Sequence, residues 1–500
     1  MKLFTADQIR AWDKYTIENE PIHSIELMER AATACTRYLV DHFGSSSFLI
    51  LAGTGNNGGD GLAIARQLKQ GGKDVSVLQI GGATLSPDCE TNLQRLKPFG
   101  IPYKKISYVN EMPAAPAAGM IVIDAILGSG QNRPLEGLEK TVVETVNVWE
   151  RDVVAIDIPT GIFADRSSAG NAAIRARYTL SFQVPKLCFL VPENEEYVGE
   201  WTVLDIGLSR SYYNSTPALF GYTEMEDIRR MLRPRSMFAH KGQFGTALIL
   251  GGQKGMMGAA ILAARACLRS GVGKLVSRVP GCGLDLMQVA VPEVICSVDG
   301  NQDFLANPPT DLSPYSAIGI GPGIGKAPFT RELIREMLRV KDIPLVLDAD
   351  ALNIIGEEGW QQDIPPGSVI TPHIGEFSRL FGPDDDHFAR LDKALEISTR
   401  MGIFIVVKGR NSFLSTPNGK GYFNSTGNPG MAKAGSGDVL TGMITGLLAQ
   451  KYTAEQASRI SMFIHGMAGD MAEKHHSIYG VTASDIIDKI GICYVKFFNN

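Results

Sequence analysis

The stretch SFLILAGTGNNGGDGLAIARQLKQGG, from Ser47 to Gly72, joins an apolar run to a helical pattern through a series of glycines. The run SFLILAG has the length and composition of a buried strand. The segment LAIARQLKQGG has helical spacing and ends on glycine, which commonly stops a helix. A strand, a glycine turn and a helix in this order predict an α/β domain with a parallel sheet.

The same alternation of apolar strand-like segments and helical segments continues along the chain in two series. The first series includes the apolar segments DVSVLQI (74–80), MIVIDAILG (120–128) and DVVAIDIPTG (152–161). The alternation is interrupted between about residues 192 and 240, and a second series begins at GTALILGG (245–252). We therefore expect an α/β protein of two domains, with a Rossmann-like parallel-sheet domain over residues 1–215 and a second α/β domain over residues 220–500.

The N-terminal segment carries a helix-start signal. Thr5 and Gln8 have the spacing of a capping box, which predicts a helix from about Ala6. A second helix is expected to follow over IELMERAATACTRYLVDHF (25–43).

The composition argues against a nucleic-acid or membrane protein. The chain has 500 residues and a net charge of −5, and it contains no long basic run. No apolar run is long enough to span a bilayer, and the N-terminus lacks the apolar core of a signal peptide. The seven cysteines form no C-x-x-C pair, which argues against a zinc or redox site and suits a reducing compartment. We expect a cytoplasmic enzyme.

The glycine-rich segment GTGNNGGDGLAIA (53–65) allows two interpretations. It is not a P-loop, because no Gly-Lys-Ser/Thr follows. The glycines could bring backbone N–H groups close to a phosphate at the start of the helix. Alternatively, the segment is a tight turn in which Asn57 and Asp60 cap the helix.

Two further strand ends in the first series carry polar residues. Asp124 ends one predicted strand, and Asp157 and Thr160 follow another. Ligands of open parallel sheets bind beyond the carboxyl ends of the strands, so these residues and Asn57 should converge on one crevice. Their oxygen atoms suit an alkali or alkaline-earth cation. The alternative is that the two aspartates only cap loops.

The second series offers three candidate site segments. TPHIGEF places His373 after a strand, either as a site residue or as a loop hydrogen-bonding residue, and a single histidine does not indicate a metal site. VVKGRNS places Lys408 and Arg410 beside a glycine, either to bind a nucleotide phosphate or as a basic turn in solvent. NPGMAKAGSGDVLTG places Asp438 at a glycine turn that opens a helix, either as a first-turn acid that suits the helix dipole or as a reactive group beside a phosphate.

The motifs NNGGDG, DAILGSGQNRP and AIDIPTG closely resemble the NAD(P)H-hydrate epimerase domain of the YjeF N-terminal type, over about residues 1–210. The resemblance implies that K⁺ is held by Asn57, Asp124 and Thr160, and that Asp157 acts as the acid or base. The residues that it implies contact the substrate are Asn56, Asn57, Gly58, Gly59, Asp60, Gly128, Ser129, Gly130, Gln131, Asn132, Arg133, Pro134 and Asp157.

The motifs GPGIG, TPHIGEF, VVKGRNS and NPGMAKAGSGDVLTG resemble the ADP/ATP-dependent NAD(P)H-hydrate dehydratase, which has a ribokinase-like fold, over about residues 225–495. The resemblance implies a nucleotide site at Lys408, Gly409, Arg410, Asn411, Ser412 and Gly437, and a hydrate site at Ala259, Gly323, His373 and Asp438. Ala260 is a neighbouring alternative to Ala259. Asp438 would take the substrate hydroxyl proton, as the equivalent acid does in sugar kinases of this fold. Mg²⁺ is expected with the nucleotide.

Together the two resemblances imply one bifunctional repair enzyme. Its first domain would interconvert the R and S hydrates of NADH and NADPH (NADHX and NADPHX), and its second would dehydrate the S form with ADP or ATP, with ADP expected. A homo-oligomer is expected, and no nucleic-acid or membrane partner. The alternatives are a small-molecule kinase of the ribokinase type, a non-catalytic binding module in the first domain, and, with less support, a metal-dependent hydrolase.

Overall fold

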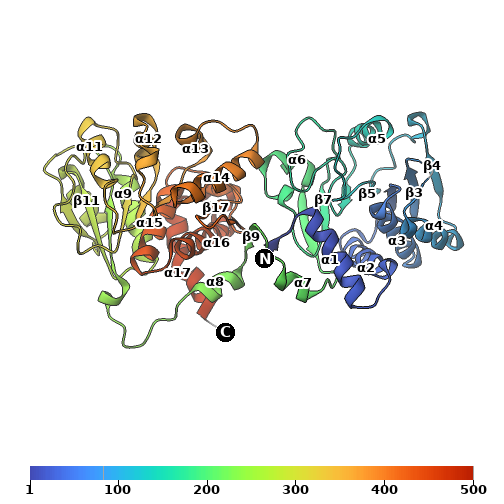
Figure 1. Cartoon of the computed structure of the whole chain (residues 1–500), viewed down its shortest axis with the longest axis horizontal. Coiled ribbons are helices and arrows are strands. Elements are labelled where there is room, and N and C mark those ends of the chain that lie inside the picture. Colours follow the sequence, from blue (N-terminus) through green and yellow to red (C-terminus); the bar gives the residue numbers. More distant parts are fainter. Residues whose placement is uncertain (83, 499–500) are drawn as a thin grey trace. The chain divides into compact units, whose positions relative to one another are not determined.

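A computed structural model of the chain, which describes residues 1–82 and 84–498, divides into two compact units (Figure 1). The N-terminal unit comprises Lys2–Ala218, and the C-terminal unit comprises the residues from Leu219 onward together with Met1. Each unit is built on a largely parallel sheet with helices packed against it, so the predicted α/β class with two parallel-sheet domains is confirmed.

The sheet of the N-terminal unit is entirely parallel and has the order β4-β3-β2-β5-β6-β7-β8. Its strands are β2 (Phe48–Ala52), β3 (Val75–Ile80), β4 (Tyr103–Ile106), β5 (Ile121–Ala125), β6 (Val153–Ile156), β7 (Tyr178–Phe182) and β8 (Glu200–Leu204). The short β1 (Lys2–Leu3) precedes them in the chain and is not a strand of this sheet. The helices are α1 (Ala6–Asn19), α2 (Ser24–Phe43), α3 (Asn56–Gln70), α4 (Pro87–Leu96), α5 (Gly137–Val148), α6 (Glu195–Val198) and α7 (Arg210–Ser215).

The strand order of this sheet reverses between β2 and β5. Chain succession runs outward from β2 to β4 on one side and from β5 to β8 on the other, which opens a crevice beyond the carboxyl ends of β2 and β5. Helices α2, α3 and α4 bury their apolar stripes on one face of the sheet, and α5 packs on the other face. The crevice is therefore bounded by the loops that follow β2, β5 and β6.

The sheet of the C-terminal unit has the order β9-β18-β17-β16-β15-β14-β13-β10-β11-β12. Its strands are β9 (Phe220–Thr223), β10 (Thr246–Leu250), β11 (Lys274–Val279), β12 (Ile295–Val298), β13 (Ala317–Ile320), β14 (Leu345–Leu347), β15 (Val369–Ile370), β16 (Phe404–Val407), β17 (Phe413–Ser415) and β18 (Gly421–Asn424). Its helices are α8 (Met225–Met231), α9 (Met257–Arg269), α10 (Leu284–Ala290), α11 (Pro328–Met337), α12 (Ala349–Glu358), α13 (Ile374–Phe381), α14 (His387–Met401), α15 (Ser436–Ala449), α16 (Ala454–Gly480) and α17 (Ala483–Phe498).

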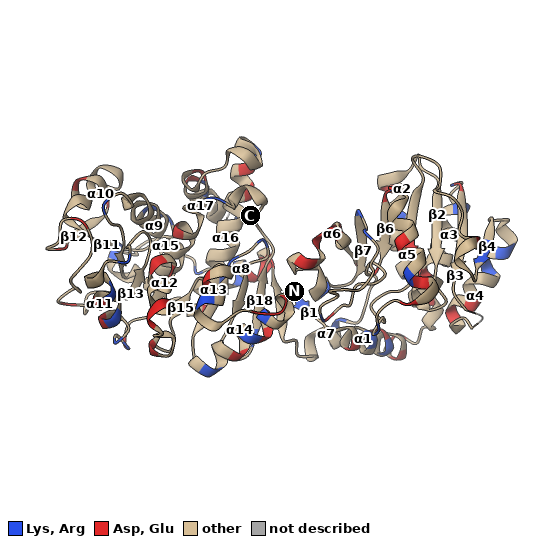
Figure 2. Ribbon diagram, turned by 90° about the horizontal axis from the view of Figure 1, so that it is seen from above, with Lys and Arg blue, Asp and Glu red and all other residues tan. Residues whose placement is uncertain are grey.

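The second sheet also has a switch point, between β10 and β13. Helices α9, α15, α16 and α17 share one apolar core on one face of the sheet, and α11 to α14 lie on the other face (Figure 2). The strands β16, β17 and β18 pair in antiparallel fashion, which the sequence pattern did not indicate. Strands of three or four residues are too short to show a reliable alternation of apolar and polar residues.

Helix α1 begins where the capping box predicts. The Thr5 hydroxyl accepts from the backbone N–H of Gln8, and the Gln8 side chain accepts from the backbone N–H of Thr5. Helix α3, by contrast, begins at Asn56, earlier than the pattern LAIARQLKQGG suggests, and its N-cap is Gly55. The interpretation of Asn57 and Asp60 as capping residues is therefore wrong.

The glycines around the start of α3 serve close packing. A Cβ at Gly53 would lie 1.9 Å from the carbonyl oxygen of Ile126, and one at Gly58 would lie 2.0 Å from the carbonyl oxygen of Gly53. A Cβ at Gly61 would lie 2.7 Å from the Cβ of Ala125. The glycines thus let α3 and the turn before it approach the loop that follows β5.

Charged residues of both signs are interspersed over the ribbons of both units (Figure 2). Among the described residues, no helix combines the length and the hydropathy needed to cross a bilayer.

The close approach at Gly53 predicts the effect of adding one methyl group. Gly53→Ala should lower the free energy of unfolding of the N-terminal unit by about 1–3 kcal/mol, because backbone atoms must shift to admit the Cβ. Gly55→Ala is the matched control, since a Cβ there meets nothing within 4 Å. Urea unfolding followed by tryptophan fluorescence reports mainly this unit, which holds Trp12, Trp149 and Trp201 of the four tryptophans. Equal midpoints for the two variants would contradict the packing argument.

Candidate active sites

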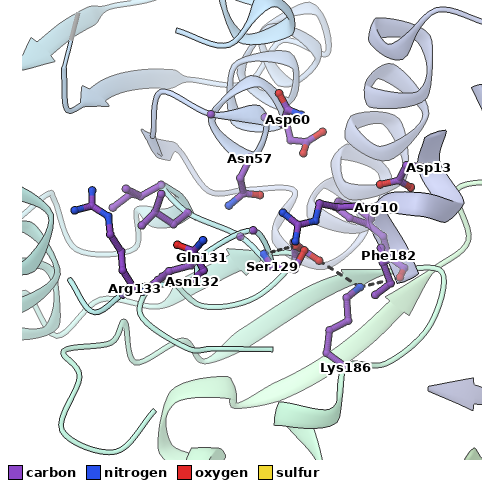
Figure 3. A pocket seen from close by; sticks show the side chains of 18 of the residues that line it. Arg10, Asp13, Asn57, Asp60, Ser129, Gln131, Asn132, Arg133, Phe182 and Lys186 are labelled. Atoms are coloured by element: carbon purple, nitrogen blue, oxygen red, sulfur yellow. Dashed lines mark hydrogen bonds and ion pairs between the residues drawn. The ribbon is translucent and has the colours of Figure 1, made fainter. Parts of the chain in front are cut away.

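A cavity of about 510 Å³ lies beyond the carboxyl ends of the strands in the N-terminal unit (Figure 3). The predicted residues that line it are Asn56, Asn57, Asp60, Gly128, Ser129, Gly130, Gln131, Asn132, Arg133, Pro134 and Asp157. Gly58 and Gly59 are buried in the packing of α3, where a Cβ at Gly59 would meet Met28. Helix α1 and the segment after β7 add Arg10, Asp13 and Lys186 to the wall, and none of these three belongs to a motif identified in the sequence.

Asp157 lies at the centre of the polar contacts in this cavity. Its carboxylate accepts from the backbone N–H of Ser129 at 2.8 Å and lies 3.3 Å from the Nζ of Lys186 (Figure 3). Its backbone is strained, with φ at 68°, a value that non-glycine residues rarely adopt outside functional or turn positions. Burial by itself would raise the pKa of Asp157, but Lys186 and Ser129 outweigh burial and lower the pKa. Asp157 is therefore held ionised.

Lys186 has almost no exposed surface, with 1% of its side chain accessible. Its ammonium donates to the carbonyl of Phe182 at 3.0 Å besides pairing with Asp157. A buried lysine is retained only where a carboxylate and hydrogen-bond acceptors compensate for its lost hydration. The sequence signal was present, because Lys186 is a lone cation within the apolar stretch from Val184 to Phe189.

Two other carboxylates of this cavity, those of Asp13 and Asp60, have raised pKa values. Within the described part of the chain, neither Asp13 nor Asp60 has a hydrogen-bond or ion-pair partner for its side chain. Burial raises the pKa of Asp13 to about 7, with Lys186 opposing the rise and Asp157 adding to it. Burial, Asp157 and Asp13 raise the pKa of Asp60 well above its usual range. The cavity thus combines one ionised carboxylate with two that hold their protons more tightly.

Asp124 and Thr160 form a buried polar cluster behind the cavity wall. The hydroxyl and the backbone N–H of Thr160 donate to Asp124 at 2.7 and 2.8 Å, and Ile126 adds a weaker bond from its backbone N–H. Burial raises the pKa of Asp124 to about 6, against the lowering effect of these bonds.

The side chain of Asn57 is buried, and both of its polar atoms lack a partner. An unpartnered amide oxygen together with the Asp124–Thr160 cluster fits a cation with oxygen ligands. No group of three or more His, Cys, Asp or Glu side chains that could hold a metal occurs among the described residues, so the donors suit a hard cation rather than zinc.

In the C-terminal unit, an ion pair joins the ends of β14 and β16. The Nζ of Lys408 lies 2.8 Å from Asp348, which has 1% of its side chain exposed, and 3.7 Å from Glu376. Burial opposes both charges, but their mutual attraction wins, so that the pKa of Asp348 is lowered and that of Lys408 is raised. The interpretation of Lys408 as part of a basic turn in solvent is therefore wrong. Asp348 directly follows a strand just as Asp157 does, and that pattern could have identified it.

Asp438 lies in the first turn of α15, beside this pair. Gly435, with φ at 91°, is the N-cap of the helix, and no side chain caps it. Within the described residues, the carboxylate of Asp438 has no hydrogen-bond or ion-pair partner. Burial raises the pKa of Asp438 to about 7, Asp348 adds to the rise and Lys408 opposes it. Asp438 therefore does not cap the helix, and its carboxylate is available for a ligand.

His373 is the N-cap of α13, and its Nδ1 accepts from the backbone N–H of Gly375 at 3.0 Å. The loop hydrogen-bonding interpretation of His373 is thus confirmed, while its Nε2 lies 3.5 Å from Glu376. That carboxylate connects His373 to Lys408, because Glu376 faces both.

The remaining predicted residues lie on α9, on the first turn of α15 and on two loops of the C-terminal unit. A Cβ at Gly323 would lie 3.0 Å from the Cβ of Ala259, which is half-buried, whereas Ala260 is fully buried. A Cβ at Gly437 would lie 3.2 Å from the Nζ of Lys408. In the loop Lys408–Ser412, the Ser412 hydroxyl donates to the carbonyl of Gly409 at 2.9 Å, while Gly409 and Arg410 are exposed.

Two family descriptions match the chain. Residues 24–188 match the family described as YjeF-related protein N-terminus, and residues 247–491 match NAD(P)H-hydrate dehydratase. The chain is similar to a ribokinase-like superfamily protein of Enterococcus faecalis, whose crystal structure aligns with 56% of this chain and 96% of its own at 24% identity and a TM-score of 0.51. That similarity concerns the fold alone.

Two relatives match along nearly the whole chain. The bifunctional NAD(P)H-hydrate repair enzyme of Thermofilum pendens is 32% identical and aligns with 98% of this chain and 95% of its own. The enzyme of the same description from Moorella thermoacetica is 32% identical and aligns with 98% of this chain and 96% of its own. The chain belongs to the family of bifunctional NAD(P)H-hydrate repair enzymes.

Proposed function

We propose that the N-terminal unit interconverts the R and S hydrates of NADH and NADPH, and that the C-terminal unit dehydrates the S form with ADP or ATP. One observation carries the proposal. Each unit holds a buried aspartate–lysine pair at the carboxyl ends of its strands, Asp157–Lys186 and Asp348–Lys408, beside a carboxylate with no partner. Ionised and protonatable groups placed side by side are what proton transfer to and from a substrate hydroxyl requires.

Epimerisation must move a proton and invert one carbon. The hydrate carries its hydroxyl on C6, next to the ring nitrogen N1, so the hydroxyl can leave and return on the other face, or the ring can open and close. The cavity in Figure 3 would hold the nicotinamide against Asp157, with the loop Gly128–Pro134 along one side. Asp157, held ionised by Lys186, is the proton acceptor.

We assign the cation-binding role to Asn57, Asp124 and Thr160. A bound K⁺ would be coordinated by the unpartnered Asn57 oxygen and would offset the negative charge of the buried Asp124. Both effects would fix the loops after β2, β5 and β6, which form the cavity.

Dehydration needs the C6 hydroxyl to become a good leaving group. Asp438 accepts the hydroxyl proton while the oxygen attacks the terminal phosphorus, whose bond to the rest of the nucleotide breaks and releases AMP from ADP or ADP from ATP. The phosphate then leaves C6 with its bonding electrons as the N1 electron pair forms the C6–N1 double bond, and loss of a proton from C5 to solvent restores the dihydronicotinamide. Lys408 and the glycine turn before α15 face the phosphoryl group, and the loop Lys408–Ser412 with Gly437 holds the nucleotide. Ala259, Gly323 and His373 lie along the hydrate. Mg²⁺ bound with the nucleotide would neutralise phosphate charge.

We further propose that the enzyme acts in the cytoplasm as a homo-oligomer. All seven cysteines are unpaired, which suits a reducing compartment.

The division of labour can be tested with mixed R and S hydrate. The full chain with ADP should return all of the hydrate to reduced nicotinamide, measured by its absorbance, whereas a fragment of residues 219–500 should consume only the S form. A fragment that consumes both epimers equally would contradict the assignment. Accumulation of a stable phosphoester would instead favour a small-molecule kinase.

Removal of the cation should affect one activity only. Epimerisation should rise and saturate as K⁺ is added to enzyme dialysed against a potassium-free buffer, while dehydration of pure S hydrate by the 219–500 fragment stays unchanged. Asp124→Asn should abolish that K⁺ dependence, because it removes a charged oxygen ligand. Equal epimerase rates with and without K⁺ would exclude the site.

Asp438→Asn should separate catalysis from stability. Dehydration should fall by about 10²–10⁴-fold, because the proton acceptor is lost, while nucleotide binding measured by calorimetry persists. The pKa of Asp438 is higher in the folded state than in the unfolded chain, so protonation of Asp438 favours the folded state. This contribution to the free energy of unfolding is complete at pH values below the ordinary pKa of a carboxyl group and is lost as pH rises through about 7. At alkaline pH the variant should therefore unfold at the same temperature as the wild type or higher.

Asp386→Ala is the matched control for that variant. Asp386 caps α14 by accepting from the backbone N–H of Ala389 at 2.8 Å, so its loss should cost about 1 kcal/mol of stability and leave dehydration near normal. An Asp438→Asn protein that dehydrates at the wild-type rate would remove Asp438 from the mechanism.

A further inference from the structure

Helix α1 places two charged side chains in the wall of the epimerase cavity. Arg10 and Asp13 are three residues apart and so share one face of the helix, and both line the cavity (Figure 3). Arg10 is paired with Asp7 on the outer surface. Asp13 has no partner among the described residues and is half-buried, so its carboxylate is available to a bound molecule.

The surroundings of Asp13 set its protonation state. The charged groups that reach it from the other walls are Asp157 after β6, Lys186 after β7 and Asp60 on α3. The loop after β5 adds Arg133 and Glu136 to the cavity lining, and the first turn of α5 adds Glu139. Burial dominates and raises the pKa of Asp13 to about 7, whereas the pKa of Asp157 is lowered by Lys186. Near neutral pH, a substantial fraction of Asp13 is therefore protonated while Asp157 is ionised.

Both routes to epimerisation need a proton donor and a proton acceptor in the same cavity. When the ring opens, the hydroxyl gives its proton to the acceptor, C6 becomes an aldehyde, the C6–N1 bond breaks and N1 takes a proton from the donor. Closing the ring on the other face reverses each transfer, so both groups are restored.

When the hydroxyl leaves instead, the donor protonates its oxygen as the C6–O bond breaks, and the N1 electron pair forms the C6–N1 double bond. Water then adds to the opposite face and gives a proton to the acceptor. That proton returns to the donor through water. A single carboxylate would have to take up a proton at one atom and then deliver it to another, whereas a donor and an acceptor serve both atoms at once.

We propose that Asp13 is the proton donor of the epimerase cavity, acting together with Asp157 as the acceptor. This assignment rests on the proposed epimerase function of the N-terminal unit. Lys186 is excluded as the donor, because its ammonium is engaged by Asp157 and the carbonyl of Phe182 and has 1% of its surface exposed. Asp60 lies near the start of α3, three residues from Asn57 and in the segment that the cation would organise, whereas Asp13 lies on α1.

The test measures epimerisation of pure S NADHX by the full-length chain across neutral pH, with chromatographic separation of the epimers. The wild-type rate should fall as pH rises through about 7, because the donor loses its proton. Asp13→Asn should lower the rate by about 10²–10⁴-fold and remove that alkaline decline. Asp13→Glu should retain a measurable rate and an alkaline decline. Glu18→Gln, on the exposed part of the same helix, is the matched control and should behave as the wild type.

The outcomes separate this proposal from the function on which it rests. A wild-type chain that does not epimerise NADHX refutes the epimerase function itself. A working wild type with an Asp13→Asn rate within about twofold of it refutes only the donor assignment. So does an Asp13→Asn variant that is slow but keeps the alkaline decline, since that result means that Asp13 only supports the helix. Dehydration of S NADHX by the same preparations, and their melting temperatures, report whether each variant is folded.

Discussion

A buried aspartate–lysine pair at the carboxyl edge of each sheet is the interaction on which both candidate sites depend. Asp157–Lys186 and Asp348–Lys408 are each desolvated, so each charge requires the other. The pair keeps its aspartate ionised in an environment where isolated carboxylates hold their protons. Asp13 and Asp438, which lie close to these pairs without joining them, both have a pKa raised to about 7. Two unrelated sheets thus arrive at the same electrostatic arrangement.

The backbone geometry that surrounds these pairs depends on glycine. At Gly53 and Gly58 the chain approaches neighbouring carbonyl oxygens at distances that no side chain permits. At Gly435 and Gly323 the positive φ angles turn the chain sharply before α15 and beside α9. Because the helices start within these turns, their first N–H groups face the crevice at the switch point of each sheet.

The two activities of the family act on the same hydroxyl, but the two sites offer different chemical groups to it. The N-terminal cavity is walled by α1 and three strand-end loops and offers carboxylates in opposite protonation states, which suits a reversible exchange of protons. The C-terminal site offers one unpartnered carboxylate beside a lysine and a glycine turn, which suits the transfer of a phosphoryl group. The groups next to each ion pair, carboxylates in the first unit and a carboxylate with a glycine turn in the second, therefore decide the chemistry of that unit.

The sequence by itself determined the α/β class, the parallel sheets, the start of α1 and the motif residues at the strand ends. Those features depend on local patterns, such as apolar runs, capping residues and polar residues placed directly after strands. It did not reveal Asp13, Lys186 or Asp348 as parts of a site, and it suggested that Asn57 and Asp60 could be caps. These features depend on contacts between distant segments: Lys186 meets Asp157 across β6 and β7, and Lys408 meets Asp348 across β14 to β16. Only the folded sheet brings such groups together, and only burial in that fold decides which carboxylate keeps its proton.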